Sequence, residues 1–145
     1  MALPGLAARD TGVRLHIPAG AKQHEVEIWQ GRATNGVQLF LVRQDGLFDR
    51  AGLYGEEGHD YGDNAERFIV FSKCVVEIAR RISPPLDLMH VHDWQAALVP
   101  VLMKDRRLPF KTVLTIHNLA YQGSFWGIDF GLPNEHDRQQ LVGLG

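Results

Sequence analysis

The chain has 145 residues, of which 45% are hydrophobic and 22% are charged, values typical of a soluble globular domain with a real core. A net charge of −2 and the lack of a basic stripe argue against nucleic acid as a partner. The single cysteine, Cys74, excludes an internal disulfide framework and offers no metal-ligand cluster. No apolar run approaches the roughly 20 residues that span a bilayer, so we expect one domain and no membrane partner.

The chain is predicted to begin with the end of a helix, over residues 3–8. Residues 13–17 then alternate between apolar and polar side chains, and Pro18 is expected to end this short strand. Residues 19–24 are interpreted as a connection.

A β-hairpin is predicted next. Residues 25–30 place Val26 and Ile28 on one face, as in a strand with one face in the core. Thr34, Asn35 and Gly36 favour a tight turn, and residues 37–42 return as a second strand. We expect this antiparallel pair to lie beside a parallel sheet.

Residues 45–62 form a long stretch without periodicity, rich in glycine and acidic side chains. Loops of this length in a compact domain are usually functional or disordered. Its aromatic residues favour an ordered loop that packs or binds: Phe48, Tyr54 and Tyr61. Four neighbouring residues carry possible metal ligands, Glu56, Glu57, His59 and Asp60, but their spacing matches no known metal site, so a solvated loop is the preferred interpretation.

The longest helix is predicted over residues 63–82, with Asp63 and Glu66 as a capping box. Seven residues form its apolar stripe: Phe68, Phe71, Ser72, Val75, Ile78, Ala79 and Ile82. The opposite face carries Lys73, Glu77 and Arg80, which we expect to be exposed. Cys74 is expected to be a core thiol, and prolines 84 and 85 stop the helix.

A strand, a helix and a second strand follow in residues 86–91, 94–104 and 112–116. A crossover of this length returns the second strand parallel to the first, in the right-handed sense. The alternation of strands and helices indicates an α/β fold.

Polar residues gather where each of these two strands ends. His90, His92, Asp93 and Trp94 lie at the first strand end, and His117, Asn118 and Tyr121 follow the second. Ligands of open parallel sheets bind at the carboxyl ends of the strands, so we expect Asp93 and His117 to face one cavity. The structural alternative is that Asp93 caps the next helix and that the histidines are ordinary buried residues.

The remaining chain carries little signal. Residues 124–131 are interpreted as an aromatic loop, and residues 132–145 have no clear pattern. The sequence has no phosphate-binding glycine-rich loop, no nucleophile elbow and no zinc spacing. Taken alone, the residues indicate an α/β domain with a polar site at two strand ends.

Three motifs add a family resemblance. The runs HVHDWQAALVPVLMK and TIHNLAYQGSF resemble the HxHDW segment and the following motif of bacterial glycogen synthases and plant starch synthases. The segment LFDRAGLYG with DYGDNAERFIVFSK is similar to the loop and helix that precede HxHDW in that family. The motifs occur in the family order and cover most of residues 3–125.

The resemblance implies a Rossmann-like parallel sheet with helices on both faces, as part of the N-terminal domain of a GT-B glycosyltransferase. Such enzymes transfer glucose from ADP-glucose or UDP-glucose to the non-reducing end of an α-1,4-glucan, with retention of configuration. The family needs no metal ion and no cofactor. Its bacterial members imply a cytoplasmic location, and a plant source would imply the plastid.

The resemblance also implies roles for five residues. Asp93 and His117 are expected to be catalytic and to line the sugar pocket, with His117 contacting the donor glucose in part through its backbone carbonyl. Asn118, Tyr121 and Tyr54 are expected to bind substrate around them.

The chain also departs from the family pattern. The family's first strand with its Lys-x-Gly-Gly loop and its whole C-terminal domain have no counterpart here, so residues 1–145 are expected to be a partial N-terminal catalytic domain that is inactive alone. A non-catalytic carbohydrate-binding or interaction module derived from that domain is the alternative. A related glycosyltransferase with another donor or acceptor is a third.

Overall fold

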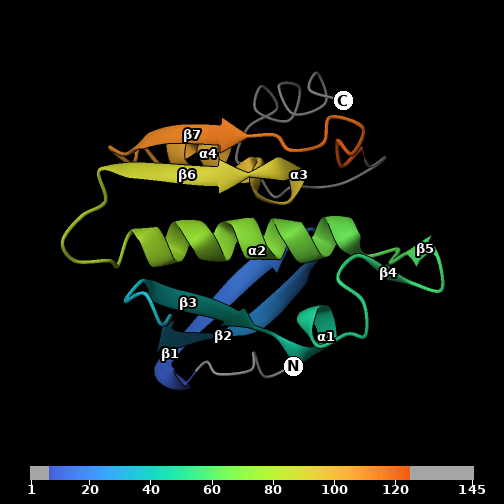
Figure 1. The fold of residues 1–145 in the computed structure, drawn as a ribbon, viewed down its shortest axis with the longest axis horizontal. Helices are drawn as coiled ribbons and strands as arrows, with labels where there is room; N and C mark the ends of the chain where they lie inside the picture. Colours follow the sequence, from blue (N-terminus) through green and yellow to red (C-terminus); the bar gives the residue numbers. More distant parts are fainter. Residues whose placement is uncertain (1–6, 125–145) are drawn as a thin grey trace.

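A computed structural model describes residues 7–124 and confirms an α/β fold. Figure 1 shows the long helix α2 (Asn64–Ala79) running between two layers. The layer on one side is a three-stranded antiparallel sheet, and the layer on the other is a two-stranded parallel sheet with its helices. The core joins residues of both layers to α2. No helix in the described residues is long and apolar enough to cross a membrane.

The antiparallel sheet has the order β1-β2-β3, formed by Ala8–Ala19, Lys22–Arg32 and Gln38–Arg43. The predicted hairpin of β2 and β3 is confirmed, and Val26 and Ile28 are buried. The predicted connection over residues 19–24 is wrong, because β1 and β2 are joined by a tight turn at Gly20, whose φ is 58°. Since β1 is an edge strand, Pro18 is tolerated inside it. The predicted helix end at residues 3–8 lies mostly outside the described residues.

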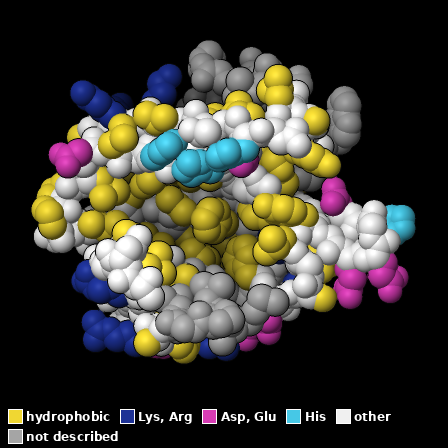
Figure 2. Space-filling model, viewed as in Figure 1, with side chains coloured by type: hydrophobic (Ala, Val, Ile, Leu, Met, Phe, Trp, Pro, Cys, Tyr) yellow, Lys and Arg dark blue, Asp and Glu magenta, His cyan; other side chains and the backbone are white. Residues whose placement is uncertain are grey.

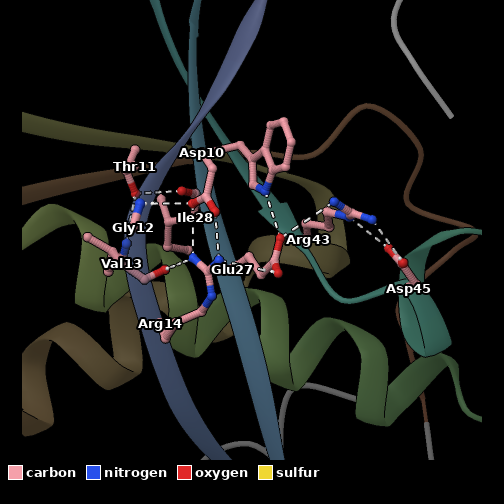
Figure 3. A network of polar contacts seen from close by, with 10 residues as sticks. Asp10, Thr11, Gly12, Val13, Arg14, Glu27, Ile28, Arg43 and Asp45 are labelled. Carbon is pink, nitrogen blue, oxygen red and sulfur yellow. Dashed lines mark hydrogen bonds and ion pairs between the residues drawn. The ribbon is translucent and has the colours of Figure 1, made fainter.

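Strand β1 is irregular near its start. Its register with β2 shifts between Asp10 and Val13, and Gly12 takes a φ of 77°, which glycine adopts without strain. Figure 3 shows the polar contacts around this bulge, in which Arg14 lies 2.6 Å from Asp10 and 3.5 Å from Glu27. The hydrogen bonds from Arg14 lower the pKa of Asp10 to about 2. These surface charges therefore neutralise one another across β1 and β2.

Between β3 and α2, the chain forms the helix α1 (Asp45–Phe48) and a small hairpin of β4 (Gly55–Glu56) and β5 (His59–Asp60). The buried guanidinium of Arg67 holds this loop against α2. It donates to the carbonyls of Leu47 at 2.7 Å and Leu53 at 3.1 Å, and to Oδ1 of Asn64 at 2.6 Å. The prediction of an ordered loop is confirmed.

We expect Arg67→Ala to lower the free energy of unfolding by about 3 kcal/mol, because buried carbonyls that lose their donor cost about 1–3 kcal/mol each. Urea denaturation followed by circular dichroism measures this change. Arg80→Ala at an exposed position is the control and should stay within about 0.5 kcal/mol. Equal effects of the two substitutions would contradict the anchoring role of Arg67.

The capping box predicted at the start of α2 is absent. Asp63 is the N-cap residue but its side chain makes no capping hydrogen bond, and it pairs instead with Arg50 at 2.5 Å. Glu66 pairs with Lys22 and His24, each at 2.7 Å, and so connects α2 to β2. Both carboxylates are therefore used for tertiary contacts instead of capping.

Helix α2 packs on more than one face, which the single predicted stripe did not anticipate. The buried residues are Asn64, Arg67, Ile69, Val70, Ser72, Lys73, Cys74, Val76 and Ala79. The expectation that Lys73 is exposed is wrong, because its Nζ donates to the carbonyl of Pro18 at 2.7 Å. It is also wrong for Glu77, whose side chain is enclosed by arginines, whereas Arg80 is exposed as expected. Cys74 is fully buried as predicted, and burial raises the pKa of its thiol to about 12.

Most of the predicted apolar stripe is only half-buried. Five of its residues fall in this class: Phe68, Phe71, Val75, Ile78 and Ile82. The spacing of the first four places them on one side of α2, and Ile82 follows the end of the helix. Figure 2 shows hydrophobic side chains filling a hollow where α2 runs between the two layers. This side of α2, which we call the open face, is therefore incompletely covered by the described residues.

The carboxylate of Glu77 is an acid-sensitive contact at the end of α2. Burial favours its neutral form, but hydrogen bonds and charges from Arg81, Arg106 and Arg80 lower its pKa below the usual 4.5. Its stabilising contribution is therefore complete above pH 4.5 and is lost as the pH falls through the lowered pKa. We expect the melting temperature to drop between pH 5 and pH 3, and to drop less in Glu77→Gln. An equal drop in both proteins would contradict this assignment.

The predicted order of strand, helical segment and strand is confirmed in the second layer, although the single predicted helix is divided in two at Ala97. They are β6 (Leu88–His92), the helices α3 (Asp93–Ala96) and α4 (Leu98–Asp105), and β7 (Lys111–Thr115). Strands β6 and β7 pair in parallel. Among residues 7–124 they form a sheet of their own, separate from β1-β2-β3. The expectation of one parallel sheet with the hairpin at its side is therefore wrong for the described residues.

Candidate active site

Asp93 and His117 meet at the carboxyl ends of the two parallel strands. His92 at the end of β6 pairs with Thr115 at the end of β7, so the residues that follow emerge at one edge of the sheet. The backbone N–H of His117 donates to Oδ1 of Asp93 at 2.7 Å, and its Nδ1 lies 2.9 Å from Oδ2. The parallel register therefore produces the juxtaposition that the sequence predicted.

Asp93 is not the helix cap that the structural alternative assigned to it. The N-cap of α3 is His92, and Asp93 is the first residue of the helix with a φ of 56°. Residues other than glycine seldom adopt this left-handed conformation, which costs about 1–3 kcal/mol and is commonest at functional sites. The sharp turn from β6 into α3 directs the carboxylate sideways to β7, where His117 binds both of its oxygens.

The hydrogen bonds of this pair keep Asp93 ionised and set the tautomer of His117. The hydrogen bonds from the backbone N–H of His117 and from its ring hold the pKa of the Asp93 carboxyl below its usual value, and the backbone N–H of Asn118 adds to the effect. An ionised carboxylate only accepts hydrogen bonds, so Nδ1 of His117 carries the hydrogen. In the neutral imidazole, Nε2 is then the acceptor.

Histidine rings continue the site along the strand edge. The ring centroids of His90 and His92 are 4.3 Å apart, and those of His92 and His117 are 5.3 Å apart. Nε2 of His90 lies 2.8 Å from Oγ1 of Thr115 on β7. Figure 2 shows histidine side chains as a continuous row beside the hollow over α2. The site therefore presents a polar edge above an apolar floor.

Trp94 of the HxHDW motif lies between Phe68 of α2 and Gly123 of the motif that follows β7. Its ring meets Phe68 of α2 edge to face, with centroids 4.9 Å apart. A Cβ added to Gly123 would lie 2.5 Å from the indole, and Gly123 has a φ of 63°, so only glycine fits there. The sequence prediction missed this contact, although a glycine in a motif beside an aromatic motif residue is a usable signal.

The three residues predicted to bind substrate differ in their contacts and exposure. Asn118 follows His117 directly, but its Oδ1 accepts from the backbone N–H of Ala120 at 3.0 Å in a local turn. Tyr121 has 68% of its surface exposed. The ring of Tyr54 lies 6.0 Å from that of Phe68, which in turn contacts Trp94. Their substrate-binding roles stay predictions.

The pair lies on an open surface. The side chains of Asp93 and His117 are 32% and 61% exposed. Asp93 and His117 line neither the cavity of about 280 Å³ between β1–β3 and the end of α2 nor the cavity of about 320 Å³ beside β1. No group of three or more His, Cys, Asp or Glu side chains within residues 7–124 is placed to hold a metal ion. The edge is suited to hydrogen bonding with a polyhydroxyl ligand.

Comparison with known proteins identifies the family. The family model described as the starch synthase catalytic domain matches residues 5–143. The chain belongs to the starch synthase catalytic domain family. It is 39% identical to a glycogen synthase from Opitutus terrae over 142 residues and 42% identical to one from Marinobacter nauticus over 146 residues. Each match covers 94% of this chain but only 30% of the relative.

A solved structure agrees with this family assignment. The catalytic domain of starch synthase IV from Arabidopsis thaliana, bound to ADP and acarbose, is similar with a TM-score of 0.63 and 25% sequence identity. The match covers 86% of this chain and 27% of that chain. This starch synthase family chain therefore corresponds to less than a third of the length of these relatives.

Proposed function

We propose that this chain forms one wall of the active site of a retaining glycosyltransferase that moves glucose from ADP-glucose to an α-1,4-glucan. The observation that carries the proposal is the hydrogen-bonded pair of Asp93 and His117, which joins the two family motifs at the carboxyl ends of adjacent parallel strands. The starch synthase bound to ADP and acarbose supports a nucleotide-sugar donor and a glucan acceptor.

Asp93 has a mechanistic role in this proposal. Its carboxylate accepts hydrogen bonds from two consecutive backbone N–H groups, those of His117 and Asn118. In a planar trans peptide the carbonyl points opposite to the N–H, so the carbonyl of His117 is directed away from Asp93. A fixed carbonyl dipole stabilises the positive charge that develops on a sugar ring as its leaving group departs.

We propose that the parallel sheet is larger in the complete GT-B domain. Strand β6 pairs on one side with β7, and among the described residues it has no second strand partner. The apolar side chains of the open face are only half-buried in the described residues, and Figure 2 shows hydrophobic side chains in the hollow where α2 runs between the two layers. A further parallel strand would satisfy the free backbone groups of β6 and bury apolar surface of α2. Residues 1–145 are accordingly part of an N-terminal catalytic domain, and a second domain completes the cleft.

The alternative function is a glucan-binding module without catalysis. The exposed Tyr121 and the half-exposed Tyr54 favour it, since aromatic surfaces with polar neighbours suit carbohydrate binding. A module of this kind requires no second domain.

A chimeric enzyme distinguishes the two functions. This chain replaces the matching segment in the glycogen synthase from Opitutus terrae, and ADP release from ADP-glucose is measured with glycogen as acceptor. The catalytic proposal expects turnover within about tenfold of the parent enzyme, a difference of about 1.4 kcal/mol in activation free energy. A folded chimera without turnover, combined with retention of the isolated chain on glycogen, would favour the binding module.

A further inference from the structure

A cationic cavity lies away from the Asp93–His117 edge. It has a volume of about 320 Å³ and is formed by β1, the C-terminal half of α2 and the residue after α4. Its charged lining consists of Arg14, Lys73, Arg81, Arg106 and the single carboxylate Glu77. Arg81 precedes β6 and Arg106 precedes β7, whereas Asp93 and His117 follow these strands. The cavity is therefore at the opposite end of the parallel pair from the proposed active site.

Several guanidinium groups share the carboxylate of Glu77. Nη1 of Arg81 lies 2.6 Å from Oε2, Nη1 of Arg80 lies 3.2 Å from Oε1, and Nη1 of Arg106 also contacts Oε1. The side chain of Glu77 is only 14% exposed. One negative charge is thus surrounded by three positive charges, which leaves the local field positive.

Arg81 and Arg106 retain hydrogen-bond donors. A guanidinium carries five N–H donors, on Nε, Nη1 and Nη2. In the part of the chain that the structure describes, Arg81 directs Nη1 to the carbonyl and carboxylate of Glu77, and Arg106 directs Nη1 to the same carboxylate. Their Nε and Nη2 groups have no protein acceptor within residues 7–124. The parallel N–H groups on Nε and Nη2 of one guanidinium match the spacing of two phosphate oxygens.

The other cations of the cavity are engaged. Arg14 pairs with Asp10 and Glu27 on the strand surface, and Nζ of Lys73 donates to the carbonyl of Pro18. Arg14 is neutralised by its two carboxylate partners, and Lys73 adds positive potential. The direct contacts fall to Arg81 and Arg106. Pro18 together with Leu15 and Ile17 supplies an apolar wall.

From this arrangement we propose that the cavity binds a small phosphate-type dianion, held by the Nε and Nη2 donors of Arg81 and Arg106. The ligand is either free phosphate or the phosphate group of a small ester whose organic part lies on the apolar wall. Its binding connects the segments that follow α2 and α4, and it is independent of the proposed glycosyl transfer.

Isothermal titration calorimetry of the 145-residue chain with inorganic phosphate tests this site, with chloride at matched ionic strength as the reference. A parallel titration uses glycerol 2-phosphate. Arg81→Gln and Arg106→Gln each remove contact donors, and we expect at least about tenfold weaker binding for either. Arg80→Gln is the matched control, because Arg80 bonds Glu77 at the same helix end but does not line the cavity. A cooperative melt, recorded for each variant, shows that it is folded.

Saturable one-to-one binding that Arg80→Gln preserves and the other two substitutions weaken supports the site. Tighter binding of glycerol 2-phosphate assigns it to an ester, and equal binding assigns it to free phosphate. Absence of saturable binding by the unsubstituted chain overturns the proposal. Equal weakening by all three substitutions also overturns it, since each substitution removes one positive charge and the effect would then depend only on net charge.

Discussion

Incubated alone with ADP-glucose and glycogen, the 145-residue chain is expected to release no ADP above background. Asp93 and His117 lie on an open surface, and the chain spans about 30% of the length of the glycogen synthases it matches. Electrostatic catalysis depends on preorganised groups in a site that excludes water, and losing one such donor costs about 10²–10³ in rate. An open edge lacks several of these groups at once, so turnover should be undetectable.

The control for this experiment is His117→Ala in the same isolated chain. Equal background signals from the two proteins are expected in a coupled assay of ADP release. Turnover by the unsubstituted chain that exceeds the His117→Ala signal would show that the open edge catalyses without a second domain. Self-association should be monitored by light scattering, because the free edge of β6 favours pairing between chains.

In the Opitutus terrae chimera, His117→Ala is expected to lower kcat by about 10²–10³ with a smaller change in KM, as for a group that acts on the transition state. The ring of His117 holds Oδ2 of Asp93 at 2.9 Å, so its removal leaves the carboxylate with only backbone donors. Steady-state kinetics of ADP release provides both constants.

His117→Asn is the informative companion substitution. The side-chain amide of asparagine places an N–H near the position of Nδ1 and can still donate to Asp93. We expect it to recover at least about tenfold in kcat over His117→Ala if the ring acts by holding Asp93, a difference of about 1.4 kcal/mol. Equal rates for the two variants would instead assign the effect to the outer part of the ring.

The parallel pair and its polar ends could be predicted because their signals are local. Two apolar runs separated by a helical repeat predict a strand, a helix and a strand. Parallel pairing of the strands then aligns the residues that follow each of them. Asp93 and His117 are 24 residues apart in the chain, yet this rule alone brings them together. The sequence could not show that the Asp93 carboxylate binds His117 instead of capping α3, because this contact depends on the backbone φ of 56° at Asp93.

The packing of α2 could not be predicted because the helix lies between two layers. A periodic stripe identifies one apolar face, but Val70, Cys74 and Val76 are also fully buried. Lys73 is buried because the carbonyl of Pro18 accepts from its ammonium group, a long-range contact that the local sequence does not encode. Strand β1 was predicted too short since its bulge near Gly12 interrupts the alternation of side chains.

The measurement that tests the role of the Asp93–His117 pair most directly is the kcat of the chimera with Asp93→Ala against that with Asp87→Ala. Both substitutions remove a carboxylate beside β6, but Asp87 precedes the strand and is exposed. We predict a loss of about 10²–10³ in kcat for Asp93→Ala and a change of less than about twofold for Asp87→Ala. Equal kcat values for the two folded variants would contradict the assignment of this strand edge as the active site.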